Sequence, residues 1–113
     1  MTSSTIYAVM NESSDEVESL RVYREPQRLA INVARTRART KSAAEETLGE
    51  VVIRDQARHE TLKYKVAWIP LEAPTDDTTH KVHVFKVFKN GRCRLQQFLD
   101  TRWTPPGVEE DAL

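Results

Sequence analysis

The stretch that decides the fold is residues 81–99, KVHVFKVFKNGRCRLQQFL. Apolar and polar residues alternate on both sides of Asn90-Gly91, the dipeptide preferred in the two-residue type I′ turn of a β-hairpin. That turn pairs Phe88 with Cys93 and predicts one face that points to the core: Val82, Val84, Lys86, Phe88, Cys93, Leu95, Gln97 and Leu99. The opposite face then holds His83, Phe85, Val87, Lys89, Arg92, Arg94, Gln96 and Phe98.

Strand-forming residues also fill four earlier stretches, which are residues 5–10, 20–23, 50–56 and 62–71. In the last of these, apolar residues alternate with Lys63 and Lys65. This alternation is typical of a strand that is covered on one side only. We therefore expect the first two stretches, and then the next two, to form antiparallel hairpins.

A helix is predicted between these two hairpins. Pro26 ends the second strand and suits the first turn of a helix, and the apolar residues that follow it fall on one arc of a helical wheel. The opposite side of the wheel holds Arg28, Arg35 and Arg39. One helix of about 20 residues that ends at Gly49 fits this pattern. Because Arg37 falls inside the apolar arc, a helix that breaks near Thr40 is the alternative.

These elements predict an α+β fold in the order β-β-α-β-β-β-β, an antiparallel β-sheet of hairpins with one amphipathic helix packed on one face. The 113 residues fit a single domain over residues 1–103, followed by an acidic, flexible tail over residues 104–113. The N-terminus lacks the features of a secretory signal, and no apolar stretch approaches the ~18 residues that a membrane span needs. We therefore expect a cytoplasmic protein with no membrane partner.

The sequence carries no recognised catalytic, cofactor or metal motif. The predicted register places Cys93 on the core face and His83 on the other, which argues against a Cys-His nucleophile. Residues three apart on a strand point to opposite faces, so His80 and His83 do not form a metal pair there. The three glycines are too far apart for a phosphate-binding loop. We therefore expect no catalytic residue, no metal and no cofactor, and binding rather than catalysis.

Charge is segregated along the chain although its total is zero. Residues 20–41 carry seven basic side chains against Glu25 alone, and residues 81–102 carry a net charge of +5. Net charge mainly affects solubility, whereas a segregated distribution of charge indicates surfaces that could bind charged partners. On the predicted hairpin face the basic side chains lie among aromatic ones, so the candidate partner-binding residues are Phe85, Lys89, Arg92, Arg94 and Phe98. If the two C-terminal hairpins lie in one sheet, the same open face also collects Arg54, Arg58, Lys63 and Lys65. A secondary basic stripe is formed on the helix by Arg28, Arg35 and Arg39.

Two functions would use these residues. Aromatic residues and arginine are enriched at the centres of protein interfaces, so the first is protein–protein interaction, with an acidic protein or with a second copy of the chain in a homo-oligomer. The alternative is nucleic-acid binding, with basic side chains on phosphates and aromatic rings stacked on bases. The pI of about 6.8 is lower than the value above ~9 that is common in nucleic-acid-binding domains. Protein–protein interaction is therefore our first hypothesis.

Overall fold

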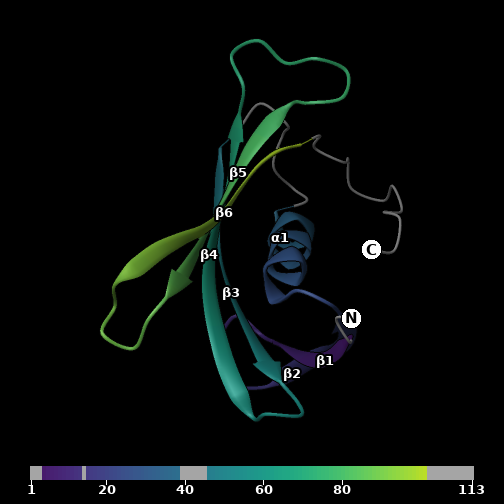
Figure 1. Ribbon diagram of the computed structural model, residues 1–113, viewed down its shortest axis with the longest axis vertical. Coiled ribbons are helices and arrows are strands. Elements are labelled where there is room, and N and C mark those ends of the chain that lie inside the picture. Colours follow the sequence, from purple (N-terminus) through teal and green to yellow (C-terminus); the bar gives the residue numbers. More distant parts are fainter. Residues whose placement is uncertain (1–3, 14, 39–45, 102–113) are drawn as a thin grey trace.

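The computed structural model describes residues 4–13, 15–38 and 46–101 of the chain. Within these residues the chain forms one helix and a single sheet of six antiparallel strands (Figure 1). The elements in chain order are β1 (Thr5–Met10), β2 (Val17–Tyr23), α1 (Pro26–Arg37), β3 (Thr47–Asp55), β4 (Glu60–Pro70), β5 (His80–Val87) and β6 (Cys93–Thr101). The predicted α+β fold and its order of elements are confirmed, whereas the predicted tail lies outside the described residues.

The strands lie side by side in the order β2-β1-β3-β4-β5-β6. The two C-terminal hairpins, β3-β4 and β5-β6, are therefore neighbours, and their side chains form one continuous surface. The helix α1 lies against one side of the sheet, mainly over β3 and β4 (Figure 1). The opposite side has no helix over it among the described elements.

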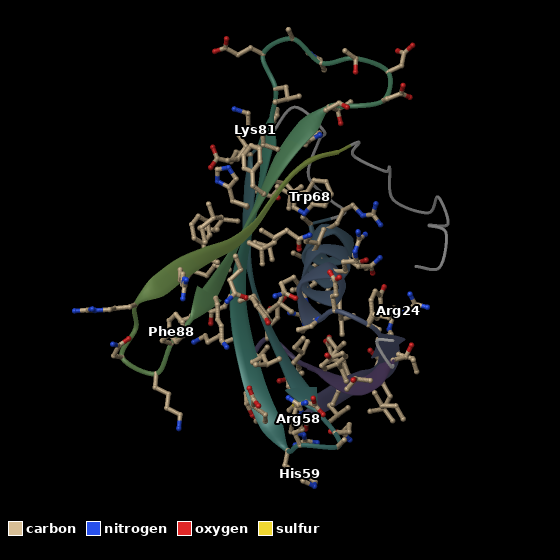
Figure 2. The ribbon with its side chains drawn as sticks, in the orientation of Figure 1. Arg24, Arg58, His59, Trp68, Lys81 and Phe88 are labelled. Atoms are coloured by element: carbon tan, nitrogen blue, oxygen red, sulfur yellow. The ribbon has the colours of Figure 1, made fainter. Side chains whose placement is uncertain are left out.

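The core forms between α1 and the sheet. As the alternation in residues 62–71 predicts, Tyr64, Val66 and Trp68 of β4 are buried on the helix side. Figure 2 shows Trp68 directed toward α1, whereas Lys81 of β5 points away from it. The buried residues of α1 that meet this face include Leu29, Ala30, Val33 and Ala34. Burial of apolar surface in this layer is the main force that holds the helix on the sheet.

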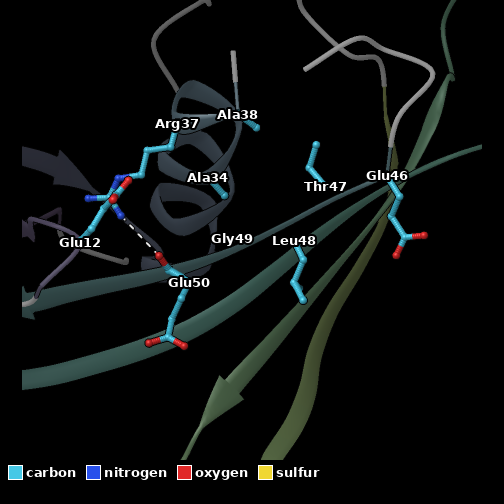
Figure 3. A pocket seen from close by; sticks show the side chains of 9 residues that line it. All are labelled: Glu12, Ala34, Arg37, Ala38, Glu46, Thr47, Leu48, Gly49 and Glu50. Atoms are coloured by element: carbon cyan, nitrogen blue, oxygen red, sulfur yellow. Dashed lines mark hydrogen bonds between the residues drawn. The ribbon is translucent and has the colours of Figure 1, made fainter. Parts of the chain in front are cut away.

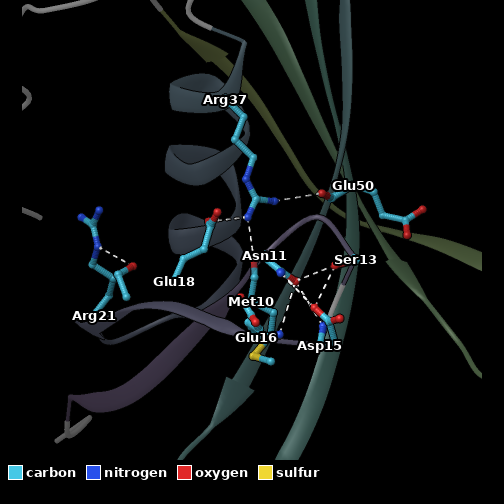
Figure 4. A network of polar contacts seen from close by, with 10 residues as sticks. Met10, Asn11, Ser13, Asp15, Glu16, Glu18, Arg21, Arg37 and Glu50 are labelled. Atoms are coloured by element: carbon cyan, nitrogen blue, oxygen red, sulfur yellow. Dashed lines mark hydrogen bonds and ion pairs between the residues drawn. The ribbon is translucent and has the colours of Figure 1, made fainter.

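The helix is shorter than the 20-residue prediction. It ends at Arg37, near the alternative break at Thr40, and Gly49 belongs to β3 instead of ending the helix. Arg37, the last residue of the helix, lies inside the apolar arc and bonds to the sheet from there (Figure 4). Its guanidinium donates to the Met10 carbonyl at 2.6 Å and to the Glu18 carboxylate at 2.9 Å.

The hairpin around Asn90-Gly91 forms, but its predicted two-residue turn is wrong. The Gly91 amide donates to the Phe88 carbonyl at 2.9 Å, and the Phe88 amide donates to the Arg92 carbonyl at 2.9 Å. Gly91 has a φ of 84°, so the loop has three residues and ends in a left-handed glycine, as in a G1 bulge. Asn-Gly is compatible with both turns, and the extra loop residue shifts the register by one.

Next to the turn, the register shift reverses which residues of β6 face the core, whereas Gln97 pairs with Val84 as predicted. Cys93 pairs with Val87, and Leu95 pairs with Phe85, so both lie on the side away from α1. Both side chains are exposed, contrary to the prediction that they point into the core. On β5 the prediction is confirmed for Val82 and Val84, which are fully buried. A second irregularity between Val84 and Phe85 leaves one extra residue on β6.

Replacing Gly91 with alanine should lower the free energy of unfolding by about 1–2 kcal/mol, because an L-residue is strained in the left-handed region. No atom lies within 4 Å of the position that the new Cβ would occupy, so this backbone strain is the whole expected effect. Urea unfolding of the wild type and the variant measures the difference. Gly91→Asn is the control and should cost less, since asparagine tolerates the left-handed region. Equal costs would contradict the assigned turn.

Candidate functional site

The side of the sheet away from α1, here called the helix-free face, collects side chains from all six strands. The strand registers fix its members because successive residues alternate between faces. They are Ile6, Ala8 and Met10 of β1; Val17, Leu20 and Val22 of β2; Leu48, Glu50, Val52 and Arg54 of β3; Thr61, Lys63, Lys65, Ala67 and Ile69 of β4; Lys81, His83, Phe85 and Val87 of β5; and Cys93, Leu95 and Phe98 of β6.

This face exposes most of the large apolar side chains that the protein leaves in water. Eight large apolar residues are exposed in the described part of the chain, and seven of them lie on the helix-free face: Ile6, Val17, Leu20, Val22, Leu48, Leu95 and Phe98. Leu48 is 70% exposed, Val22 63% and Leu20 60%. The eighth, Phe88, lies on the other side, where the Lys86 ammonium is 5.6 Å from its ring centroid. Exposed apolar residues are therefore concentrated on one surface.

Five of these seven residues form two patches at opposite ends of the strand order, whereas Leu48 lies on the central strand β3 and Val17 at the start of β2. The aliphatic patch consists of Ile6, Leu20 and Val22 on β1 and β2, beside a small buried cluster of Ala8, Met10 and Val52. The aromatic patch consists of His83, Phe85, Leu95 and Phe98 on β5 and β6. The His83 ring centroid lies 4.9 Å from that of Phe98 and 6.0 Å from that of Phe85. These rings form one contact group.

Charged residues separate the two patches. This basic belt consists of Arg54, Lys63 and Lys65, together with Glu50, on the central strands β3 and β4. The Lys63 ammonium pairs with the Glu50 carboxylate at 2.9 Å, and Arg54 donates to the Gln56 side-chain carbonyl at 3.0 Å. Lys65 lies opposite Phe85 in the register. The belt therefore adjoins the aromatic patch directly.

Only part of the predicted partner-binding set comes together. Phe85 and Phe98 share the helix-free face, joined by His83. Arg94 pairs with Lys86 and lies on the helix side, so its predicted place beside the two phenylalanines is wrong. Lys89 and Arg92 lie in and beside the hairpin turn, outside the strands. The three-residue loop is the cause, because it reverses the faces of β6 next to the turn.

The basic stripe predicted on the helix is not present as such. Arg28 is exposed, with its guanidinium 3.7 Å from the Glu25 carboxylate. Arg35 is buried instead, with its guanidinium 6.0 Å from the Trp68 ring centroid, and this burial lowers its pKa below the ordinary value. Arg39 lies outside the described residues. A wheel cannot show this difference, since the packing of the helix on the sheet places Arg35 next to Trp68 of β4.

The sequence prediction missed the aliphatic patch. Its signal is the unbroken run from Ile6 to Met10, which is apolar on both faces of the strand where an exposed face would normally alternate with polar residues. The paired strand adds Leu20 and Val22 to the same face. The β1-β2 hairpin is therefore apolar on a face that no helix covers among the described elements.

Neither the pair of Cys93 and His83 nor a metal site is assembled by the described residues. Cys93 and His83 lie on the same face, contrary to the prediction, but they are four residues apart in the register, or roughly 13 Å along the strands. No three His, Cys, Asp or Glu side chains gather as a metal site would need in the part of the chain described here. A cavity of about 430 Å³ lies at the end of α1 (Figure 3). Arg37 in its wall is already bonded to the Glu50 carbonyl at 3.4 Å.

Cys93 should react with a thiol reagent in the folded protein. Its side chain is exposed in the structure, whereas the sequence prediction buries it in the core. We expect complete modification by 5,5′-dithiobis(2-nitrobenzoate) under native conditions, at a rate within about tenfold of that in denaturant, because access controls the rate for an exposed thiol. Absorbance at 412 nm measures the reaction. A thiol that reacts only after unfolding would support the two-residue turn instead.

No protein family, curated protein or solved structure matches this chain. None of the described helices is long and apolar enough to cross a membrane. The geometry of the helix-free face is therefore the basis for assigning a function.

Proposed function

We propose that this chain is a protein-binding module, without catalytic activity, that holds a protein partner or a second copy of itself against its helix-free face. The observation that supports this function is the concentration of seven exposed large apolar side chains on that face. An antiparallel sheet that faces water normally presents polar side chains. Contiguous exposed apolar patches are typical of protein interaction sites.

A photo-crosslinking residue tests this function directly. We would place p-benzoylphenylalanine at position 20 on the helix-free face, and at position 21 as a control on the same strand but the opposite face. In cells that produce the protein, position 20 should give a discrete protein adduct on irradiation, and position 21 should not. An adduct at the mass of a dimer identifies self-association, and another mass identifies a different partner. Equal adduct patterns at the two positions would contradict the proposal.

Nucleic-acid binding is the second candidate, and one arrangement favours it. Lys63 and Lys65 lie opposite Val87 and Phe85, so basic side chains adjoin rings on which bases could stack. Against this candidate, a bound nucleic acid would leave the aliphatic patch uncovered. Because Arg35 is buried, the basic stripe predicted on the helix is also not available at the surface. Fluorescence anisotropy with a labelled oligouridine tests this candidate. Binding that weakens with salt and is lost in Lys65→Glu would support it.

A further inference from the structure

From the charges of the helix-free face we infer the class of its partner: an acidic polypeptide segment whose carboxylates contact the basic belt while its apolar side chains cover the two patches. This inference rests on the proposed function. It selects one of the two occupants that the proposed function allows, and it excludes the second copy.

The basic belt is not neutralised by its own residues. Its members are three basic side chains, Arg54, Lys63 and Lys65, and one acid, Glu50. Glu50 is already paired with Lys63 at 2.9 Å, and the Arg54 Nε donates to a neutral amide. Lys65 is in no ion pair among the described residues, and it lies opposite Phe85 in the register. The face therefore presents an excess of positive charge.

A second copy of the chain fits this face poorly. The belt lies on β3 and β4, the two central strands in the order of six. In a symmetric dimer that stacks two copies face to face and buries both patches, the two-fold axis passes through the centre of the face. The basic belt of one copy would therefore lie against the basic belt of the other. The lysines of both copies would then lose water without gaining counter-charges. Burial of unpaired charges is strongly unfavourable.

An acidic segment satisfies both the charge and the shape of the face. Six strands at about 4.8 Å spacing span about 24 Å from β2 to β6. A helix of about 16 residues has the same length. Carboxylates near its middle would reach Lys65 and Arg54, and apolar side chains near its ends would reach Leu20 and Phe98. Complementary charge of this kind selects the partner and accelerates association.

Fluorescence anisotropy with two labelled peptides of about 17 residues tests the inference. Both peptides are helix-forming, with leucines toward the ends of one face, and they carry either glutamates or lysines at the middle. We expect the glutamate peptide to bind about tenfold more tightly than the lysine peptide at low salt. Lys65→Glu should remove this preference, while Arg24→Glu, the same charge change away from the basic belt (Figure 2), should leave it within about twofold. Lys65→Gln serves if Lys65→Glu does not fold.

The possible outcomes separate the inference from the proposed function. Equal binding of both peptides, unchanged by Lys65→Glu, would overturn the acidic partner and leave the apolar face as a docking surface. A discrete dimer in light scattering with no glutamate-peptide binding would overturn it in favour of a second copy. Tighter binding of oligouridine than of the glutamate peptide, also lost in Lys65→Glu, would overturn it in favour of nucleic acid. If the protein is a monomer that binds none of these probes, and positions 20 and 21 give equal crosslinks, both the inference and the proposed function would be overturned.

Discussion

Leu29→Ala should lower the free energy of unfolding by about 2–5 kcal/mol, because the leucine side chain fills a buried site that cannot collapse completely. Leu29 is 0% exposed and lies in the core between α1 and the sheet. Such a loss is a large share of the roughly 5–15 kcal/mol that stabilises a domain of ordinary size. We therefore expect this variant to unfold at a much lower urea concentration than the wild type.

Leu20→Ala is the matched control, since it removes the same atoms from the helix-free face. Leu20 is 60% exposed, so the expected cost is below about 1 kcal/mol, most of it from strand propensity. Urea unfolding of both variants, followed by circular dichroism at low protein concentration, measures the two costs. Equal costs would show that the face is already covered in the isolated chain. A cost for Leu20→Ala that grows with protein concentration would show burial in an oligomer.

The sequence predicts the fold well because the period of its apolar residues is clear where one face is buried. The alternation around Tyr64 assigns β4 and its faces correctly. Asn90-Gly91 likewise locates the last hairpin, but the dipeptide fits two loops that differ by one residue. In a strand a shift of one residue exchanges the two faces. Local sequence therefore predicts the hairpin but not its register, which depends on which of the two loops the backbone adopts.

The candidate site was harder to predict for two physical reasons. Strand order is a tertiary property, and only the order places the aliphatic and aromatic patches at opposite ends of one face. The helical wheel also treats every arginine as exposed on its polar side. Arg35 shows the limit of this treatment, because its stem and guanidinium lie against Trp68. Phe85 and Phe98 were correctly placed on one face, and of the basic residues predicted beside them Lys63 and Lys65 lie there, whereas Arg94 does not.

The core should also make the protein sensitive to alkaline pH through Tyr64. This residue is 2% exposed, and its burial raises the pKa of the phenol to about 12, with a smaller contribution from Tyr7. In the unfolded chain the phenol has a pKa of about 10. Between these values the folded state keeps the phenolic proton and the unfolded state has lost it, so the free energy of unfolding falls as the pH rises. The full loss, reached above the folded pKa, is about 3 kcal/mol.

Tyr64→Phe isolates this contribution because it removes the titrating hydroxyl and keeps the ring. Other groups also titrate in the same range, so the quantity to compare is the change in the free energy of unfolding between pH 9 and pH 11.5 in each protein. The wild type should lose about 2 kcal/mol more than the variant by pH 11.5, because the full loss is reached only above the folded pKa of about 12. Difference absorbance at 295 nm, wild type minus variant, should show phenolate formation near that same pH. Parallel losses in the two proteins would mean that water reaches the Tyr64 hydroxyl, and the packing of α1 over β4 would then be looser than the structure shows.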